Sequence, residues 1–316
     1  MIGLTDPDVE NRGNGLNIVG RGGEHQFDAL GQFKWSLPFI YPIRLFVEAK
    51  FRNRKTGIDV IRAEVGILVD LNHNYSTVRL EGMELYLPRY DYHSLVVSAS
   101  GFSQNAIRMA IAHKIQLLDL SSPQYYNLLD SINSLIDQIW NRNGTISDGN
   151  AIRIRSSFRN ILGLGSQGYY IDDFNDKLME IRDETSRLGG IFLASTNTSL
   201  VVPLVPENYN NFIESLRNNP NQKVSIIWYD ENSEWEIIPK DESYKLKFAL
   251  PEEMAKYVFG TTGADPRDQA LNAKMNYISH LSFIADLGRE REMPQPILCT
   301  LSYDDDLTEQ LIGDFE

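Results

Sequence analysis

Cysteine, an excess of basic residues and long apolar runs are all scarce or missing in this sequence of 316 residues. Cys299 is the only cysteine, which excludes an internal disulfide framework and a zinc site built from several cysteines, and fits a reducing cytoplasm. No apolar run approaches the roughly 20 residues that a membrane-spanning helix needs. The first residues include Asp6, Asp8 and Glu10, where a secretory signal peptide has basic and then apolar residues. We therefore expect a soluble, cytoplasmic protein with no membrane partner.

The net charge of −13, taken as an average, argues against a protein that coats nucleic acid through bulk positive charge. The charge is unevenly distributed, however. The first 125 residues carry 13 basic and 13 acidic side chains, so the whole acidic excess belongs to the remainder. The average therefore describes neither part, and the neutral N-terminal part is the one that we expect to meet a nucleic acid.

A polar, turn-rich stretch in the middle of the chain marks a division. Apolar residues recur at helical spacing over residues 128–139, and Ser122 as N-cap with Pro123 in the first turn begins the predicted helix. Residues 144–150 follow it and are polar. The expected parts are residues 1–121, a connecting helix and linker at 122–148, and an acidic part at 149–316.

The clearest strand pattern in the N-terminal part carries a carboxylate and a lysine. Apolar and polar residues alternate over residues 43–51, which is the period of a half-buried strand. Glu48 and Lys50 therefore point to the same face, about 6–7 Å apart along the strand. Such a pair can hold a metal-bound water between its two charged groups, whereas the simpler interpretation is a salt bridge between neighbouring side chains.

A second extended segment upstream supplies further oxygen ligands. Glu24, Gln26 and Asp28 share one face if this segment is a strand. The two strands, joined around the loop at 38–42, form a hairpin-like pair in which Asp28 and Glu48 meet. Two carboxylates with open coordination positions suit Mg²⁺, which prefers oxygen ligands and usually keeps several waters.

A βαβ unit is predicted further along the chain. Residues 93–100 and 115–120 are short apolar strands, and the segment between them has the apolar spacing of a helix with Ser103 as its cap. The two strands should therefore be parallel, with a right-handed crossover. Another helix is predicted over residues 58–71.

This arrangement resembles a PD-(D/E)xK nuclease, in particular the Mrr-like restriction endonuclease branch. The matching segments are, in order, Gln26-Phe-Asp-Ala-Leu-Gly31, Glu48-Ala-Lys50, Leu95-Val-Val-Ser-Ala-Ser-Gly-Phe102 and Ile115-Gln-Leu-Leu-Asp119. The resemblance extends over residues 20–120, about a third of the chain. It implies Asp28 and Glu48 as metal ligands, joined by the Ala49 backbone carbonyl, and Lys50 as the residue that orients the attacking water or stabilises charge.

The resemblance also implies a fold and an activity. The expected fold class is α/β, with a restriction-endonuclease-like mixed sheet core flanked by helices and a C-terminal α+β domain. The expected activity is that of a Mg²⁺-dependent DNA endonuclease in restriction or anti-phage defence, with Mn²⁺ as a substitute ion. The alternatives are an inactive nuclease-fold protein that binds DNA or a partner, and a repair or recombination nuclease. A homodimer would allow both strands to be cut, because one active site cuts one strand.

Several further residues have both a functional and a structural interpretation. Arg52, Arg54 and Lys55 follow the Glu48–Lys50 strand directly, and they form either a loop that contacts DNA phosphates or a solvated turn. Gln26 could hydrogen-bond a water or a phosphate, or serve the structure alone. Glu24 is a candidate for the additional acidic residue that family members often carry upstream.

The acidic C-terminal part has the pattern of an α+β domain without a chemical signature. Its position after the nuclease-like part suggests a sensor, specificity or partner-binding role, so we expect it to bind a regulatory ligand or a protein partner. The strands are predicted at 191–194, 200–205, 223–229, 234–238, 244–250 and 297–303, and the helices from Pro251 and over 269–287.

Overall fold

The computed structural model describes thirteen stretches of the chain. These are residues 9–11, 16–33, 41–80, 83–121, 125–143, 148–161, 175–187, 190–196, 201–229, 234–249, 271, 274–288 and 295–308. Residues Leu120–Ile191 form one compact unit, and the chain before and after them, Met1–Asp119 with Phe192–Glu316, forms the other. No helix in the described stretches is both long and apolar enough to cross a membrane.

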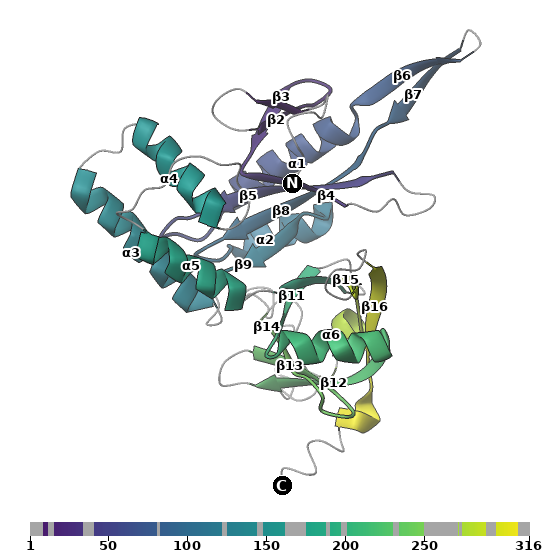
Figure 1. Ribbon diagram of the computed structural model, residues 1–316. Helices are drawn as coiled ribbons and strands as arrows, with labels where there is room; N and C mark the ends of the chain where they lie inside the picture. Colours follow the sequence, from purple (N-terminus) through teal and green to yellow (C-terminus); the bar gives the residue numbers. More distant parts are fainter. Residues whose placement is uncertain are drawn as a thin grey trace. The chain divides into compact units, whose positions relative to one another are not determined.

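A four-stranded mixed sheet organises the N-terminal part (Figure 1). Its order is β4-β5-β8-β9, where β4 is antiparallel to β5 and the other neighbours are parallel. The strands are β4 (Ala29–Gln32), β5 (Ile43–Lys50), β8 (Asp91–Ser98) and β9 (Gln116–Asp119), and the helices are α1 (Ile58–Asn72) and α2 (Gln104–His113). The predicted βαβ unit is present as β8-α2-β9, and Ser103 caps α2 by accepting a hydrogen bond of 3.3 Å from the Ala106 amide.

Two smaller sheets accompany this one. Strands β1 (Val9–Asn11), β2 (Leu16–Val19) and β3 (Glu24–Phe27) form a three-stranded antiparallel sheet. Strands β6 (Tyr75–Leu80) and β7 (Met83–Pro88) form a separate hairpin, which extends as a long ribbon beyond α1 in Figure 1. The segment between α1 and β8 is therefore a two-stranded ribbon rather than part of the main sheet.

The buried face of β5 is the one that carries polar residues. Arg44 and Phe46 are fully buried, whereas Leu45 and Val47 on the other face are half-buried. The Arg44 guanidinium lies 3.3 Å from the centre of the Tyr90 ring, and it donates hydrogen bonds to Gln32 and to the Tyr92 hydroxyl. Aromatic contact and neutral oxygen acceptors together make the burial of this charge tolerable.

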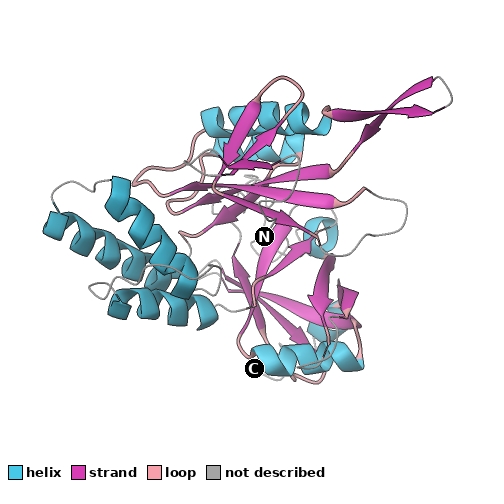
Figure 2. Cartoon of the chain, turned by 45° about the horizontal axis from the view of Figure 1, so that its top comes forward, coloured by secondary structure: helices cyan, strands magenta, loops and turns pink. Residues whose placement is uncertain are grey.

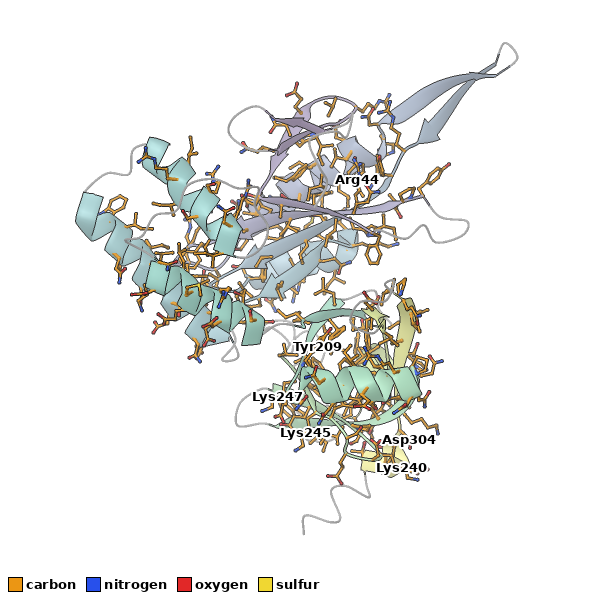
Figure 3. All side chains as sticks on the ribbon, in the orientation of Figure 1. Arg44, Tyr209, Lys240, Lys245, Lys247 and Asp304 are labelled. Carbon is orange, nitrogen blue, oxygen red and sulfur yellow. The ribbon has the colours of Figure 1, made fainter. Side chains whose placement is uncertain are left out.

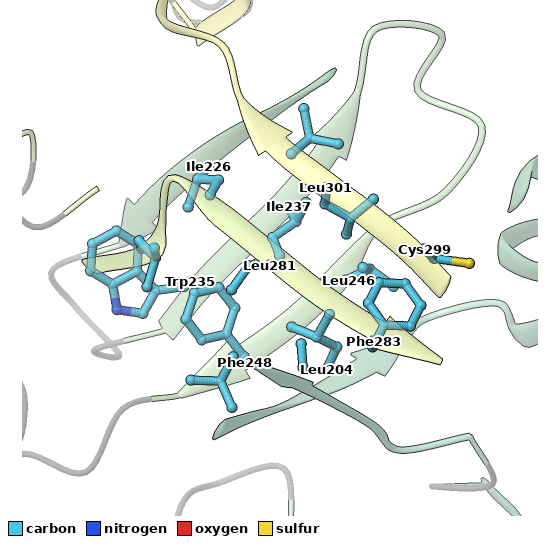
Figure 4. Close-up of a cluster of buried hydrophobic side chains, with 14 of the residues drawn as sticks. Leu204, Ile226, Trp235, Ile237, Leu246, Phe248, Leu281, Phe283, Cys299 and Leu301 are labelled. Carbon is cyan, nitrogen blue, oxygen red and sulfur yellow. The ribbon is translucent and has the colours of Figure 1, made fainter. Parts of the chain in front are cut away.

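A closed barrel of seven strands forms the part after residue 191. Its strand order is β10-β11-β14-β13-β12-β16-β15, with every pair antiparallel except β12 and β16. The strands are β10 (Phe192–Ser195), β11 (Val201–Pro206), β12 (Asn221–Tyr229), β13 (Glu234–Pro239), β14 (Leu246–Ala249), β15 (His280–Asp286) and β16 (Pro296–Tyr303), accompanied by α6 (Tyr209–Asn218) and the π-helix η3 (Lys274–Ile278). Inward-facing residues of alternate positions fill the barrel with apolar side chains (Figure 4).

Helices alone make up the described part of the second unit (Figure 2). They are α3 (Tyr126–Asn143), α4 (Asp148–Ile161) and α5 (Asn175–Arg187). Leu135 and Ile139 of α3 pack against Leu178 and Ile181 of α5, as expected from the apolar period over residues 128–139. The predicted cap at Ser122 and Pro123 lies outside the described residues.

The expected fold class is wrong. The part after residue 191 closes into a barrel instead of forming an open α+β sheet, and the N-terminal strands are divided among three sheets. Helices α1 and α2 pack against each other, since two right-handed crossovers in the same direction along β5-β8-β9 place both helices on one face of the sheet. The described residues therefore do not form a clear restriction-endonuclease-like α/β sandwich.

One wrong assignment accounts for much of this difference. A helix was predicted over residues 269–287, whereas residues 280–286 form strand β15, which pairs with both β10 and β16 and so closes the barrel. Leu281, Phe283 and Ala285 are buried and alternate with more exposed neighbours, which is the period of a strand. The six predicted strands of this part are present to within two residues at each end, and the helix predicted from Pro251 lies outside the described residues.

Phe248→Ala tests the barrel core. Phe248 is fully buried and its ring stacks on that of Trp235 at 5.9 Å, so truncation should lower the free energy of unfolding by about 3–5 kcal/mol. Leu298→Ala, at a side chain that is 63% exposed, is the control and should change it by less than about 0.5 kcal/mol. Urea unfolding followed by tryptophan fluorescence measures both, and equal effects would contradict a core position for Phe248.

Candidate functional site

Asp28 lies where the chain leaves one sheet and enters another. It follows β3, which pairs with β2, and precedes β4, which pairs with β5. Its amide donates to the Val47 carbonyl at 3.2 Å, and its carboxylate Oδ2 accepts a hydrogen bond of 2.7 Å from the Ala49 amide. The side chain of Asp28 thus takes the place of the next backbone acceptor in the ladder beside β5. This contact brings Asp28 to the end of the strand that carries Glu48 and Lys50.

Glu48 and Lys50 are partly buried at the carboxyl end of β5. The Lys50 ammonium is in direct contact with Glu48 Oε1, and the two side chains are 16% and 23% exposed for the lysine and the glutamate respectively. Both lie on the same face of β5 as Phe46. Phe46 is paired with Ser94 of β8, so Ser94 faces the same side of the sheet. Glu48 and Lys50 therefore form the salt bridge of the simpler interpretation, on a face of the sheet that is covered by a helix.

The covering helix contributes a carboxylate that the sequence analysis missed. Glu64 of α1 is 3% exposed, and its Oε2 accepts a hydrogen bond of 2.8 Å from the fully buried Ser94 hydroxyl. Ile61, Glu64 and Leu71 are the buried residues of α1, so the carboxylate occupies a position in the apolar stripe of the helix. The sequence carries one signal of this residue: Glu64 is acidic at a position where the helical period predicts an apolar residue.

Burial is the largest influence on the Glu64 carboxyl, and it raises the pKa above the usual value. The hydrogen bond from Ser94 and the positive charge of Lys50 lower this pKa, whereas the negative charges of Glu48 and Asp28 raise it further. Ser94 faces the same side of the sheet as Glu48 and Lys50, so its partner Glu64 also lies on this face. Together with Asp28, the side chains here supply three carboxyl groups and one ammonium group.

The donor set of Asp28 and Glu48 fits a divalent cation. Both offer carboxylate oxygens, the ligands that Mg²⁺ prefers, and each has one oxygen engaged, by the Ala49 amide and by Lys50. No further hydrogen bond or ion pair of either carboxylate is found within the described stretches of the chain. Three His, Cys, Asp or Glu side chains close enough to share one ion are not found among the described residues. Asp28 and Glu48 would hold an ion together with backbone oxygen or water.

Gln26 and Glu24 lie upstream on β3. Their side chains are exposed, as is that of Asp28, whereas His25 and Phe27 are more buried, so the predicted alternation is present. Strand β3 pairs with β2 and not with β5. Gln26 is thus two residues from the Asp28 carboxylate on the same side of the strand, and Glu24 is four residues away.

Arg52, Arg54 and Lys55 form an exposed loop directly after β5. The Ser100 hydroxyl contacts the backbone carbonyls of Arg52 and Arg54 at 2.6 and 2.8 Å, so it joins this loop to the end of β8. The backbone of the loop is therefore anchored while its side chains face solvent. A cationic loop of this kind adjoins the carboxyl ends of the two parallel strands.

A polar cavity of about 1,100 Å³ lies on the barrel part of the chain. It is formed by α6, the first residues of β12, the turn after β13 and the segment that follows β16, which includes Asp304 (Figure 3). The Lys223 ammonium contacts the Asp304 carboxylate at 2.8 Å in its wall, and this hydrogen bond lowers the pKa of Asp304. A ligand in this cavity would meet mainly amide and charged side chains.

Asp70 joins α1 to the turn that precedes β3. Its carboxylate accepts a hydrogen bond of 2.8 Å from the Gly22 amide and lies 2.8 Å from His25 Nε2. Gly20 is required by this contact, because a Cβ atom there would lie 2.0 Å from Asp70 Oδ2. The strand that leads into Asp28 is thereby fixed against α1.

Asp70→Asn should destabilise the protein in a pH-dependent way. Burial acts most strongly on the Asp70 carboxyl and raises its pKa, but the hydrogen bonds from His25 and Gly22 outweigh burial and the pKa is lowered. The stabilisation is therefore complete above the unfolded value of about 3.9 and is lost as pH falls through the folded value. Urea unfolding should show wild type about 1–2 kcal/mol more stable than the variant at pH 5 and a shrinking difference below pH 4. A constant difference down to pH 3 would contradict this role.

Comparisons with protein-family models, with curated proteins and with solved structures found no match for this chain. The features of this chain with chemical potential are therefore its own: the Asp28 carboxylate at the Ala49 amide, the Glu48–Lys50 pair, the buried Glu64 and the cationic loop that follows β5.

Proposed function

We propose that this protein is a divalent-cation-dependent DNA endonuclease that hydrolyses phosphodiester bonds at the end of β5. The observation that carries this proposal is the hydrogen bond between Asp28 and the Ala49 amide, which places a second carboxylate next to Glu48 and Lys50. Two carboxylates beside one lysine can bind a cation and still present a positive group to the substrate.

Asp28 and Glu48 are the ligands in this proposal, with the Ala49 carbonyl as a third oxygen. A bound Mg²⁺ or Mn²⁺ would lower the pKa of a coordinated water and offset negative charge on the phosphate. Lys50 is paired with Glu48 in the structure. Glu48 would hold the cation through its second oxygen, and the Lys50 ammonium would orient the attacking water and stabilise charge on the reacting phosphate.

The loop of Arg52, Arg54 and Lys55 supports a nucleic acid as the substrate. Its side chains are exposed, and its backbone is joined to β8 through Ser100. Contacts from such side chains to phosphate oxygens fix the position of a duplex without reading its sequence. Gln26 and Glu24 are exposed on β3, two and four residues before Asp28 in the chain.

A binding protein that does not cut DNA is the second candidate. The contact between Lys50 and Glu48 favours it, because a closed ion pair is also what a purely structural pair of side chains would form. In that case the cationic loop would bind DNA while Glu48 and Lys50 would serve the sheet alone. Cleavage assays separate the two candidates.

Lys50→Ala should reduce nicking of supercoiled plasmid by a factor of about 10²–10³ in the presence of Mg²⁺, because a group that stabilises transition-state charge is removed. EDTA should abolish nicking by wild type. Lys240→Ala, at an exposed lysine of the barrel part, is the matched control and should retain full activity (Figure 3). Cleavage by Lys50→Ala at the wild-type rate would overturn the catalytic assignment, and no cleavage by wild type with Mg²⁺ or Mn²⁺ would favour the binding protein.

Neutralising the cationic loop should weaken DNA binding in a salt-dependent way. With all three side chains changed to glutamine, the slope of log affinity against log salt should decrease in magnitude by about 2–3, since each lost phosphate contact removes about 0.9. Fluorescence anisotropy with a labelled duplex at several salt concentrations measures the slope.

A matched triple variant controls for the change in net charge. It replaces three exposed arginines of α4 by glutamine, at Arg153, Arg155 and Arg159. If both triple variants change the slope equally, net charge and not the loop decides binding.

A further inference from the structure

Glu64 is a buried carboxylate that the proposed chemistry does not yet use. It lies in the apolar stripe of α1, and its hydrogen-bond partner among the described residues is the neutral Ser94 hydroxyl at 2.8 Å. One neutral hydroxyl offsets only a small part of the free energy that is lost when a carboxylate leaves water. Burial therefore favours the protonated form of this carboxyl group, and a cation nearby would favour the charged form instead.

Glu64 approaches the face of β5 that carries Glu48 and Lys50. Its partner Ser94 lies beside Phe46 in the β5-β8 register, and Phe46 shares its face of β5 with Glu48 and Lys50. The charges that act on Glu64 are those of Asp28, Glu48 and Lys50. The three acidic groups and one lysine carry a formal charge of −2 when all are ionised, which matches one divalent cation.

We propose that Glu64 is a positioning residue for the divalent cation, acting on the ion from the α1 side of the sheet while Asp28 and Glu48 ligate it. The inference rests on the proposed function, since the ion is the one assigned to Asp28 and Glu48. It extends that function by assigning part of the ion affinity to a residue on a different element.

The geometry indicates an indirect contact. In the part of the chain that the structure describes, no three acidic, histidine or cysteine side chains lie close enough to share an ion directly. Mg²⁺ usually keeps several of its waters in protein sites. Glu64 would therefore accept a hydrogen bond from a water of the ion, while Ser94 fixes the orientation of the carboxylate.

A purely structural role predicts a different result for Glu64→Gln. Glutamine has nearly the same shape, and its carbonyl oxygen can still accept the hydrogen bond from Ser94. If Glu64 only fills space between α1 and β8, this change removes a buried charge and leaves every other property intact. If Glu64 positions the ion, the same change lowers ion affinity without lowering the stability of the metal-free protein.

Isothermal titration calorimetry of the full chain with Mn²⁺, and separately with Mg²⁺, tests the inference. We expect Glu64→Gln to weaken binding by about 10–100-fold, as changes to groups that support metal ligands commonly do. Asp28→Asn should remove binding. Asp59→Asn, at an exposed acidic residue in the first turn of α1, is the matched control and should bind as wild type.

Thermal unfolding with and without Mn²⁺ gives a second measurement. The melting temperature of metal-free Glu64→Gln should equal or exceed that of wild type, and the upward shift caused by the ion should be smaller than in wild type. Wild-type affinity in Glu64→Gln, with binding lost in Asp28→Asn, would overturn this inference and leave the proposed function standing. Absence of any binding by wild type would overturn the proposed site at Asp28 and Glu48 itself.

Discussion

The hydrogen bond from the Ala49 amide to the Asp28 carboxylate is the contact on which the candidate site depends. Strand β4 pairs with β5 only as far as Val47, and beyond that point the neighbouring chain belongs to a different sheet. The Asp28 carboxylate accepts the hydrogen bond of the next β5 amide, at the point where β4 no longer supplies a backbone acceptor. This contact holds Asp28 beside the end of β5 that carries Glu48.

Charge burial shapes the rest of this region. The face of β5 that packs under α1 carries Arg44, Glu48 and Lys50 instead of an unbroken apolar row, and α1 presents Glu64 to the same face. Arg44 is compensated by aromatic rings and neutral oxygens, whereas Glu48 is compensated by Lys50. Glu64 has only a hydroxyl group among its hydrogen-bond partners in the described structure. In the proposed function, a divalent cation would offset the negative charge of these carboxylates.

Much of the local structure could be predicted from the sequence. The alternation over residues 43–51 predicts strand β5, and the apolar spacing of α1 and α3 predicts helices, because the period of apolar residues decides between strand and helix. Ser103 marks the start of α2 as its cap. Glu64 is a single acidic residue within an apolar stripe and belongs to no recognised motif. The helix predicted over residues 269–287 is wrong for residues 280–286, whose buried residues alternate with more exposed ones as in a strand.

The sequence by itself determined strands such as β5 and β8, the helices α1, α2 and α3, and the placing of an acidic and a basic residue two positions apart on β5, because these depend on periods and propensities within short segments. Only the tertiary structure decided that β15 pairs with both β10 and β16, that α1 and α2 share one face of the sheet, and that Glu64 contacts Ser94 on the face that carries Glu48 and Lys50. Barrel closure and the meeting of distant carboxylates arise from contacts between residues far apart in the chain. No local period records which strand will supply the missing partner.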